Sequence, residues 1–136
     1  MSEYTDEQWD EMVDLLTYIA AADRRTIGNT DVKVWLDAAT DAGWPSMTAA
    51  YRAVVKHRNE QPGKWLEPGH VTCILDRVRR QASATYQRPT DQQIPMDVLS
   101  DPNAYRRHMI RKAQEHQAAY MAAFECGDQL AIEASA

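Results

Sequence analysis

The sequence has few of the residues that interrupt regular structure, with only 5 glycines and 6 prolines among 136 residues. Residues that favour strands are scattered and form no alternating runs, whereas Ala, Met, Gln, Arg and Glu are plentiful. This composition argues against a sheet protein and favours helices. We therefore predict an all-α protein.

Cysteine is also scarce. The 2 cysteines of the sequence, Cys73 and Cys126, stand far apart and form no CxxC pair. No apolar run is long enough to cross a bilayer, and no signal peptide is recognisable. These absences predict a soluble, cytoplasmic protein without membrane contact. Since Cys73 stands beside Ile74 and Leu75 on a predicted helix, we expect its thiol to be reduced and largely buried.

Motifs of catalysis are missing as well: there is no G-x-S-x-G, no H-E-x-x-H and no phosphate-binding glycine loop. We therefore expect no catalytic residues, no cofactor and no enzymatic activity. His70 and Cys73 stand three apart on a helix, a spacing that can chelate a metal, and His108 and His116 could add ligands. His70 belongs to a first helical turn and Cys73 to the core side, so no metal site is predicted.

Lys and Arg are missing from residues 1–22, which hold six acids: Glu3, Asp6, Glu7, Asp10, Glu11 and Asp14. Residues 77–112, in contrast, hold eight basic side chains against three acidic ones. The formal net charge of −5 conceals this segregation. Such asymmetry can steer a protein towards an anionic partner.

Apolar spacing predicts five helices. The first four cover about 5–22, 30–42, 46–58 and 68–80, and we expect them to form a compact four-helix bundle domain over residues 1–82. A flexible linker rich in Ser, Thr, Gln and Pro follows over 83–100. A long amphipathic C-terminal helix then covers 101–127, and the tail 128–136 is expected to fray.

Several helix ends carry recognisable signals. Thr5 and Gln8 have the spacing of a capping box at the start of the first helix. Either Thr30 or Asp31 is suited to cap the second. Pro68 has the fixed backbone angle of a first helical position, so the fourth helix is predicted to begin there.

The fourth helix combines an apolar stripe with arginines. Val71, Ile74, Leu75 and Val78 recur at helical spacing and form its buried side. The arginines fall mainly outside this stripe. Together with two arginines of the fifth helix they are candidate contacts to phosphates of nucleic acid, the alternative being a solvated basic face. This candidate set is Arg77, Arg79, Arg80, Arg106 and Arg107.

The fifth helix has an apolar stripe of its own, formed by Tyr105, Met109, Ala113, His116, Tyr120 and Phe124. Two uses of this stripe are open. It can fold back onto the bundle, or it can bind a partner, either in a groove of another protein or by pairing with its own copy in a homodimer. These six residues are therefore the candidate partner-binding set.

The order of residues over 20–80 resembles a known pattern. The run AAADRRTIGNTDVKVWLDAATDAGWPSMTAAYRAVVKHRNEQPGKWLEPGHVTCILDRVRR looks like small helical proteins of actinobacteria and their phages. Those proteins share an Asp-Arg-Arg turn, a short helix with Val and Trp, an Ala- and Val-rich helix, and a W-L-x-P-x-H-V entry to an Arg-rich helix. This layout is similar to the phage replicative helicase loader and inhibitor family.

The resemblance implies a helical N-terminal domain and a C-terminal region that contacts a ring-shaped replicative helicase and holds it inactive until delivery to origin DNA. Such loaders need no active site. On this chain, the linker and the fifth helix would contact the helicase, although the family tail is mostly disordered and this helix is well formed. The expected partner is thus a hexameric replicative helicase or another host or phage replication protein, with a weak contact to single-stranded DNA.

Two alternatives remain open. The chain could be a small DNA-binding regulator whose third and fourth helices act as a helix-turn-helix-like pair, although their loop is longer than the roughly three or four residues typical of that motif. It could also inhibit another host protein, with the acidic first helix as the contact surface.

Overall fold

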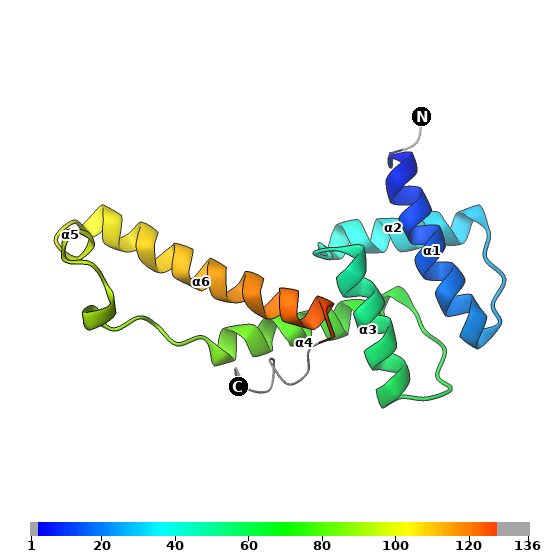
Figure 1. Cartoon of the computed structure of the whole chain (residues 1–136). Helices are drawn as coiled ribbons and strands as arrows, with labels where there is room; N and C mark the ends of the chain where they lie inside the picture. The colour runs from blue at the N-terminus through cyan, green and yellow to red at the C-terminus, as the bar shows by residue number, and fades with distance from the viewer. Residues whose placement is uncertain (1–2, 128–136) are drawn as a thin grey trace. The chain divides into compact units, whose positions relative to one another are not determined.

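A computed structural model describes residues 3–127, which are largely helical and contain no strand (Figure 1). The all-α prediction is confirmed. The elements are α1 (Asp6–Asp23), α2 (Asn29–Ala42), α3 (Met47–Glu60), α4 (Pro68–Thr85), the 3₁₀ turn η1 (Asp91–Gln93), α5 (Met96–Leu99) and α6 (Pro102–Glu125). The predicted tail, 128–136, lies outside the described residues.

The chain divides into two compact units, residues 1–77 and 78–136, and the boundary falls inside α4. The sequence predicted a first domain over 1–82, so the observed boundary comes slightly earlier on the same helix. Unit 1 therefore contains α1, α2, α3 and the first part of α4. Unit 2 contains the end of α4, η1, α5 and α6.

Local capping signals position the first helix as predicted. The Thr5 amide donates to Gln8 Oε1 at 2.9 Å, and the Gln8 amide donates to Thr5 Oγ1 at 3.1 Å. This reciprocal pair satisfies two amides at the start of α1.

The start of α2 differs from the prediction, because neither Thr30 nor Asp31 is its N-cap. Gly28 occupies that position with an extended backbone, and the helix begins at Asn29. Asp31 instead accepts a hydrogen bond from the Gly28 amide at 2.8 Å. Its carboxylate thus lies in the first turn, where the helix dipole stabilises negative charge.

Unit 1 has its core between these helices. Each helix contributes apolar side chains that are at most 5% exposed, and three of those on α3 are alanines, whose small size allows neighbouring helices to approach closely. The core side chains are Met12, Leu15, Leu16, Ile19, Val32, Trp35, Leu36, Ala49, Ala50, Ala53, Val54, Leu66, Val71, Ile74 and Leu75.

Trp44 links the turn between α2 and α3 to α4. Gly43 ends α2 with a φ of 67°, a left-handed conformation that favours glycine. Trp44 then donates from its indole Nε1 to Thr72 Oγ1 at 3.0 Å and packs edge-on against Trp35, with ring centroids 6.3 Å apart. This short turn therefore connects α2 to α4 through the Trp44 side chain.

Cys73 is exposed, so the prediction of a largely buried thiol is wrong. The two residues that follow it, Ile74 and Leu75, are buried. Successive helical residues are turned by about 100° around the axis, so Cys73 faces away from the stripe that Val71, Ile74 and Leu75 form.

In unit 2, α4 continues to Thr85, beyond the helix end predicted at Arg80. The segment predicted as a flexible linker, 83–100, contains the end of α4, η1, α5 and a buried side chain, Ile94. After α5 the chain reverses, and the long C-terminal helix that the sequence predicted, α6, runs back beside the end of α4 (Figure 1).

Candidate functional site

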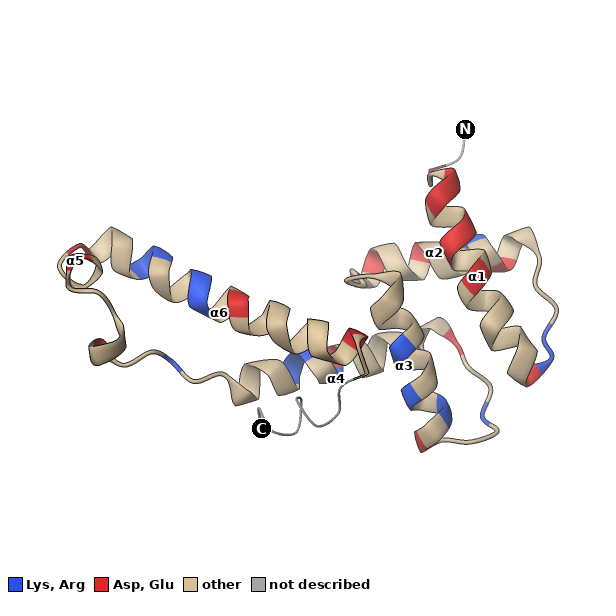
Figure 2. Cartoon of the chain, viewed as in Figure 1, with Lys and Arg blue, Asp and Glu red and all other residues tan. Residues whose placement is uncertain are grey.

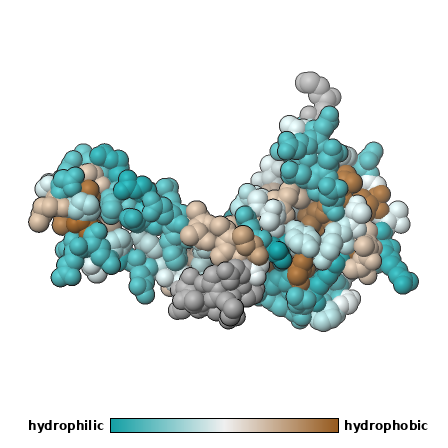
Figure 3. Space-filling model, in the orientation of Figure 1, coloured by the Kyte–Doolittle hydropathy of each residue, from teal (hydrophilic) through white to brown (hydrophobic). Residues whose placement is uncertain are grey.

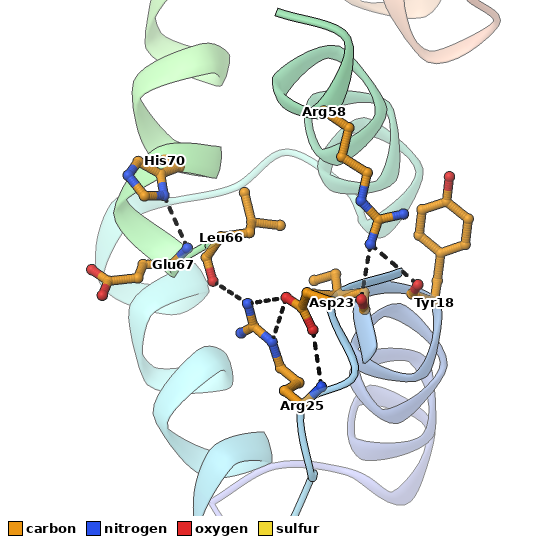
Figure 4. A network of polar contacts seen from close by, with 8 residues as sticks. Tyr18, Asp23, Arg25, Arg58, Leu66, Glu67 and His70 are labelled. Atoms are coloured by element: carbon orange, nitrogen blue, oxygen red, sulfur yellow. Dashed lines mark hydrogen bonds and ion pairs between the residues drawn. The ribbon is translucent and has the colours of Figure 1, made fainter. Parts of the chain in front are cut away.

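The Asp-Arg-Arg turn and the W-L-x-P-x-H-V segment, two motifs noted in the sequence, meet in unit 1 (Figure 4). Arg25 donates from Nε to Asp23 Oδ2 at 2.8 Å and from Nη2 to the Leu66 carbonyl at 2.7 Å. Its guanidinium lies 4.0 Å from the centre of the Trp65 ring. A single arginine thereby joins two segments that are about 40 residues apart.

Asp23 is the anionic partner of this arginine. Burial alone would raise the pKa of Asp23, but hydrogen bonds from the Arg25 side chain and amide outweigh burial and hold that pKa below its ordinary value. The side chains of Arg25 and Asp23 are only 10% and 18% exposed. Arg25 and Asp23 therefore form a nearly buried ion pair whose role is structural.

Arg58 completes the same network from α3. Its Nη2 donates to the carbonyls of Ile19 at 2.9 Å and Tyr18 at 3.3 Å, and its guanidinium lies 4.7 Å from the Tyr18 ring centre (Figure 4). These carbonyls belong to the last part of α1, where a cation is favoured by the helix dipole. Arg58 thus connects α3 to the last part of α1 within unit 1.

His57 and His70 form a stacked pair between α3 and α4, with ring centroids 4.7 Å apart and planes inclined by 25°. The Glu67 amide donates to His70 Nδ1 at 2.9 Å, which positions the His70 ring at the start of α4. His57 is 6% exposed, and its Nδ1 has no hydrogen-bond partner. Burial, and next the neighbouring His70, lower the pKa of His57, while Glu60 opposes this effect and Lys64 adds to it.

We expect the lowered pKa of His57 to make unit 1 less stable in mild acid. An unfolded histidine takes up a proton near pH 6.5, whereas folded His57 does so only at lower pH, so the unfolded state binds more protons in between. Stability is therefore complete above about pH 7 and falls as the pH drops through both pKa values. Thermal melts of wild type and His57→Gln between about pH 7.5 and 5 test this. Equal pH dependence in the two proteins would contradict it.

The metal-ligand spacing of the sequence does not lead to a cluster. His70 is held by Glu67 and His57, whereas the exposed Cys73 faces away. His116 contacts the end of α4, and both belong to unit 2, whereas His70 and Cys73 belong to unit 1. Within residues 3–127, no three His, Cys, Asp or Glu side chains are grouped so that they could hold a metal ion.

The C-terminal half of the predicted partner-binding stripe is covered by the protein itself. His116 Nε2 lies 2.9 Å from the Ala82 carbonyl and 3.1 Å from Thr85 Oγ1, and its ring packs on Tyr86. Tyr120 and Phe124 are 5% and 4% exposed. Burial raises the pKa of Tyr120. Ala113, between the two halves, is half-buried.

The N-terminal half of the stripe remains accessible. Tyr105 and Met109 line an open cavity of about 600 Å³ at the end of unit 2 where α5 meets α6. The cavity combines apolar side chains with two arginines and one carboxylate, and Figure 3 shows apolar surface at this end of the unit. We call this site the distal groove, and its lining residues are Arg88, Asp91, Leu99, Pro102, Tyr105, Arg106, Met109 and Ile110.

Sequence reasoning missed several residues of the distal groove. Ile110 is 51% exposed, and Arg88 donates from Nη2 to the Tyr105 hydroxyl at 2.8 Å. Nearby in the chain, Met96 is 78% exposed. The sequence did contain a signal for Ile110. This isoleucine lies outside the apolar stripe of the helix, and no other large apolar residue stands three or four positions away from it. Arg88 was hidden in a segment that we predicted to be a linker.

The five arginines predicted to contact nucleic acid are divided between the units, with Arg77 in unit 1 and Arg79, Arg80, Arg106 and Arg107 in unit 2. Both Glu60 oxygens accept from Arg77 Nη2, at 2.7 and 2.9 Å, which lowers the pKa of Glu60. Arg80, Arg106 and Arg107 are exposed, and Arg79 is half-buried. Arg106 precedes His116 by ten residues, so it lies about 15 Å along α6 from the contact with α4. Figure 2 shows the basic residues of α6 in its first half.

Comparison with protein-family models, curated proteins and solved structures finds no match for this chain. Over the part that the structure describes, no helix is both long and apolar enough to cross a membrane.

Proposed function

We propose that this chain is a non-enzymatic phage or prophage DNA-replication accessory protein that binds a replicative helicase and loads or inhibits it. The proposal rests on the sequence resemblance and on one structural observation, the distal groove. An accessible apolar cavity with arginines at its edge is suited to receive a partner segment that carries apolar and acidic side chains.

The distal groove refines which residues would make the contact. Tyr105, Met109 and Ile110 supply apolar surface, and Arg88 and Arg106 supply positive charge. His116, Tyr120 and Phe124 support the groove indirectly, because they attach or bury the other half of α6. Deleting α6 would therefore disturb the fold of unit 2, and single exposed substitutions are the better test.

We expect Ile110→Glu to weaken helicase binding by about tenfold or more, because it places a carboxylate in the centre of the apolar contact. Val34→Glu is the matched control, since Val34 lies in unit 1 and is 52% exposed, against 51% for Ile110. Titration of a purified hexameric helicase with each variant gives the affinity, and the helicase ATPase rate gives the functional effect.

Binding by Ile110→Glu at wild-type affinity would contradict the role of the distal groove. Failure of the wild-type chain to bind helicase would contradict the helicase as partner, and affinity purification from host extract with mass spectrometry would then identify the protein bound. Sequence-specific retardation of duplex DNA would instead favour the regulator. The structure disfavours α3 and α4 as a helix-turn-helix, because residues 61–67 separate them.

A further inference from the structure

Unit 1 has a groove along the exposed side of α1 that the proposed function does not use. Two cavities of about 410 and 320 Å³ adjoin there, since Glu11 and Met47 line both. The larger lies between α1 and the start of α3, and the smaller extends to Tyr4 and Trp44. We call the two cavities together the α1–α3 groove.

Aromatic side chains form much of the larger cavity. The rings of Tyr18 on α1 and Tyr51 on α3 are 4.9 Å apart and tilted by 59°, and Tyr51 is 37% exposed. Arg58 lies over Tyr18, and Arg52 lies 5.6 Å from the Tyr51 ring centre. The arginines stabilise the positions of both rings, so the surface offered to a ligand is preorganised.

The charged residues that line this groove are both acidic. Glu11 and Asp14 line it from successive turns of α1, both are exposed, and neither forms an ion pair with another residue of 3–127. No Lys or Arg lines either cavity. α1 contains no Lys or Arg, and apart from Asp23 its acids lie in its first half (Figure 2).

We propose that the α1–α3 groove binds a basic amphipathic helix of a protein partner. Such a helix would place apolar side chains between Tyr18, Met47 and Tyr51 and direct Lys or Arg towards Glu11 and Asp14. Phosphates are repelled by these carboxylates, so nucleic acid does not fit the groove. The chain then has two docking surfaces of opposite charge, one on each unit.

A model peptide tests this proposal directly. The probe is a fluorescently labelled 14-residue peptide of Leu and Lys, with Leu on one helical face, and its anisotropy is followed on titration with the full chain. We expect saturable binding that weakens with salt. Glu11→Gln combined with Asp14→Asn should weaken it roughly fivefold, because two exposed ion pairs are lost. Thr48→Trp, an exposed residue in the groove, should block it without changing the charge.

The matched control is Glu7→Gln combined with Asp10→Asn. These acids also stand three apart on α1, are exposed and line neither cavity. The control should bind like wild type. Equal weakening in both double variants, unchanged binding by Thr48→Trp, or no binding of the Leu and Lys peptide would each overturn the proposal. So would self-association of the chain that the Glu11 and Asp14 variant abolishes, since the occupant would then be a second copy. Helicase binding through the distal groove is unaffected by any of these results.

Discussion

Arg25→Ala is expected to lower the free energy of unfolding by about 3 kcal/mol. The substitution removes three contacts at once: the ion pair with Asp23, the hydrogen bond to the Leu66 carbonyl and the stacking on Trp65. It also leaves the Asp23 carboxylate unpaired in a site where burial opposes its charge. Loss of a partner from a nearly buried pair is more destabilising than the net contribution of the pair itself.

Chemical denaturation of wild type, Arg25→Ala and Arg25→Lys measures this effect. Lysine keeps the charge but has no planar fork to contact Asp23 and Leu66 together, so Arg25→Lys should fall between the other two. Arg24→Ala is not a suitable control, because Arg24 has a φ of 61° and ends α1 in a left-handed conformation. Arg80→Ala, at an exposed position, is suitable. A loss below about 0.5 kcal/mol for Arg25→Ala would show that this junction does not stabilise the fold.

Ile74→Ala is expected to cost about 2 to 5 kcal/mol, because it removes a buried side chain and leaves a cavity in a packed interior. Ile74 is 5% exposed on the face of α4 that also buries Val71 and Leu75. The neighbouring residue provides an internal control, since Cys73→Ala changes an exposed side chain on the same turn. That variant should stay within about 0.5 kcal/mol of wild type.

The comparison of these two variants tests the orientation of α4 around its axis. If Cys73→Ala were the more destabilising, Cys73 and not Ile74 would lie on the buried face of α4. Melting curves of both proteins, measured in reducing buffer, are sufficient to decide.

Features that depend on near neighbours were predictable from sequence. The capping box of Thr5 and Gln8 and the start of α4 at Pro68 agree with the structure, because each depends on contacts within one helical turn. The predicted N-cap of α2 was wrong. Asp31 can serve either as an N-cap or as an acceptor for the Gly28 amide, and the sequence does not distinguish these two roles.

The candidate site was predictable only in part. An apolar stripe on α6 indicates burial but does not identify the covering surface, so the sequence could not separate the accessible Tyr105 and Met109 from the covered Tyr120 and Phe124. The distal groove also needs Arg88, which comes from outside α6. Long-range contacts of this kind have no periodic signal in sequence.

The junction around Arg25 gives a structural role to the two segments on which the proposed family resemblance rests. Its Asp-Arg-Arg turn and its W-L-x-P-x-H-V segment are the two halves of one structural contact. Residues that stabilise a fold are needed whatever the fold does, so these two segments are explained by the stability of unit 1 without reference to any activity. The helicase assay is therefore decisive for function in a way that the motifs are not.

The continuous helix α4 has a thermodynamic consequence for the whole chain. Its residues up to Arg77 belong to one unit and its residues from Val78 to the other, yet helix formation is cooperative along the backbone. The backbone hydrogen bonds of α4 therefore cross the boundary between the two units without a break in the helix. Neither unit can be excised at its boundary without cutting α4 and leaving an uncapped helix end.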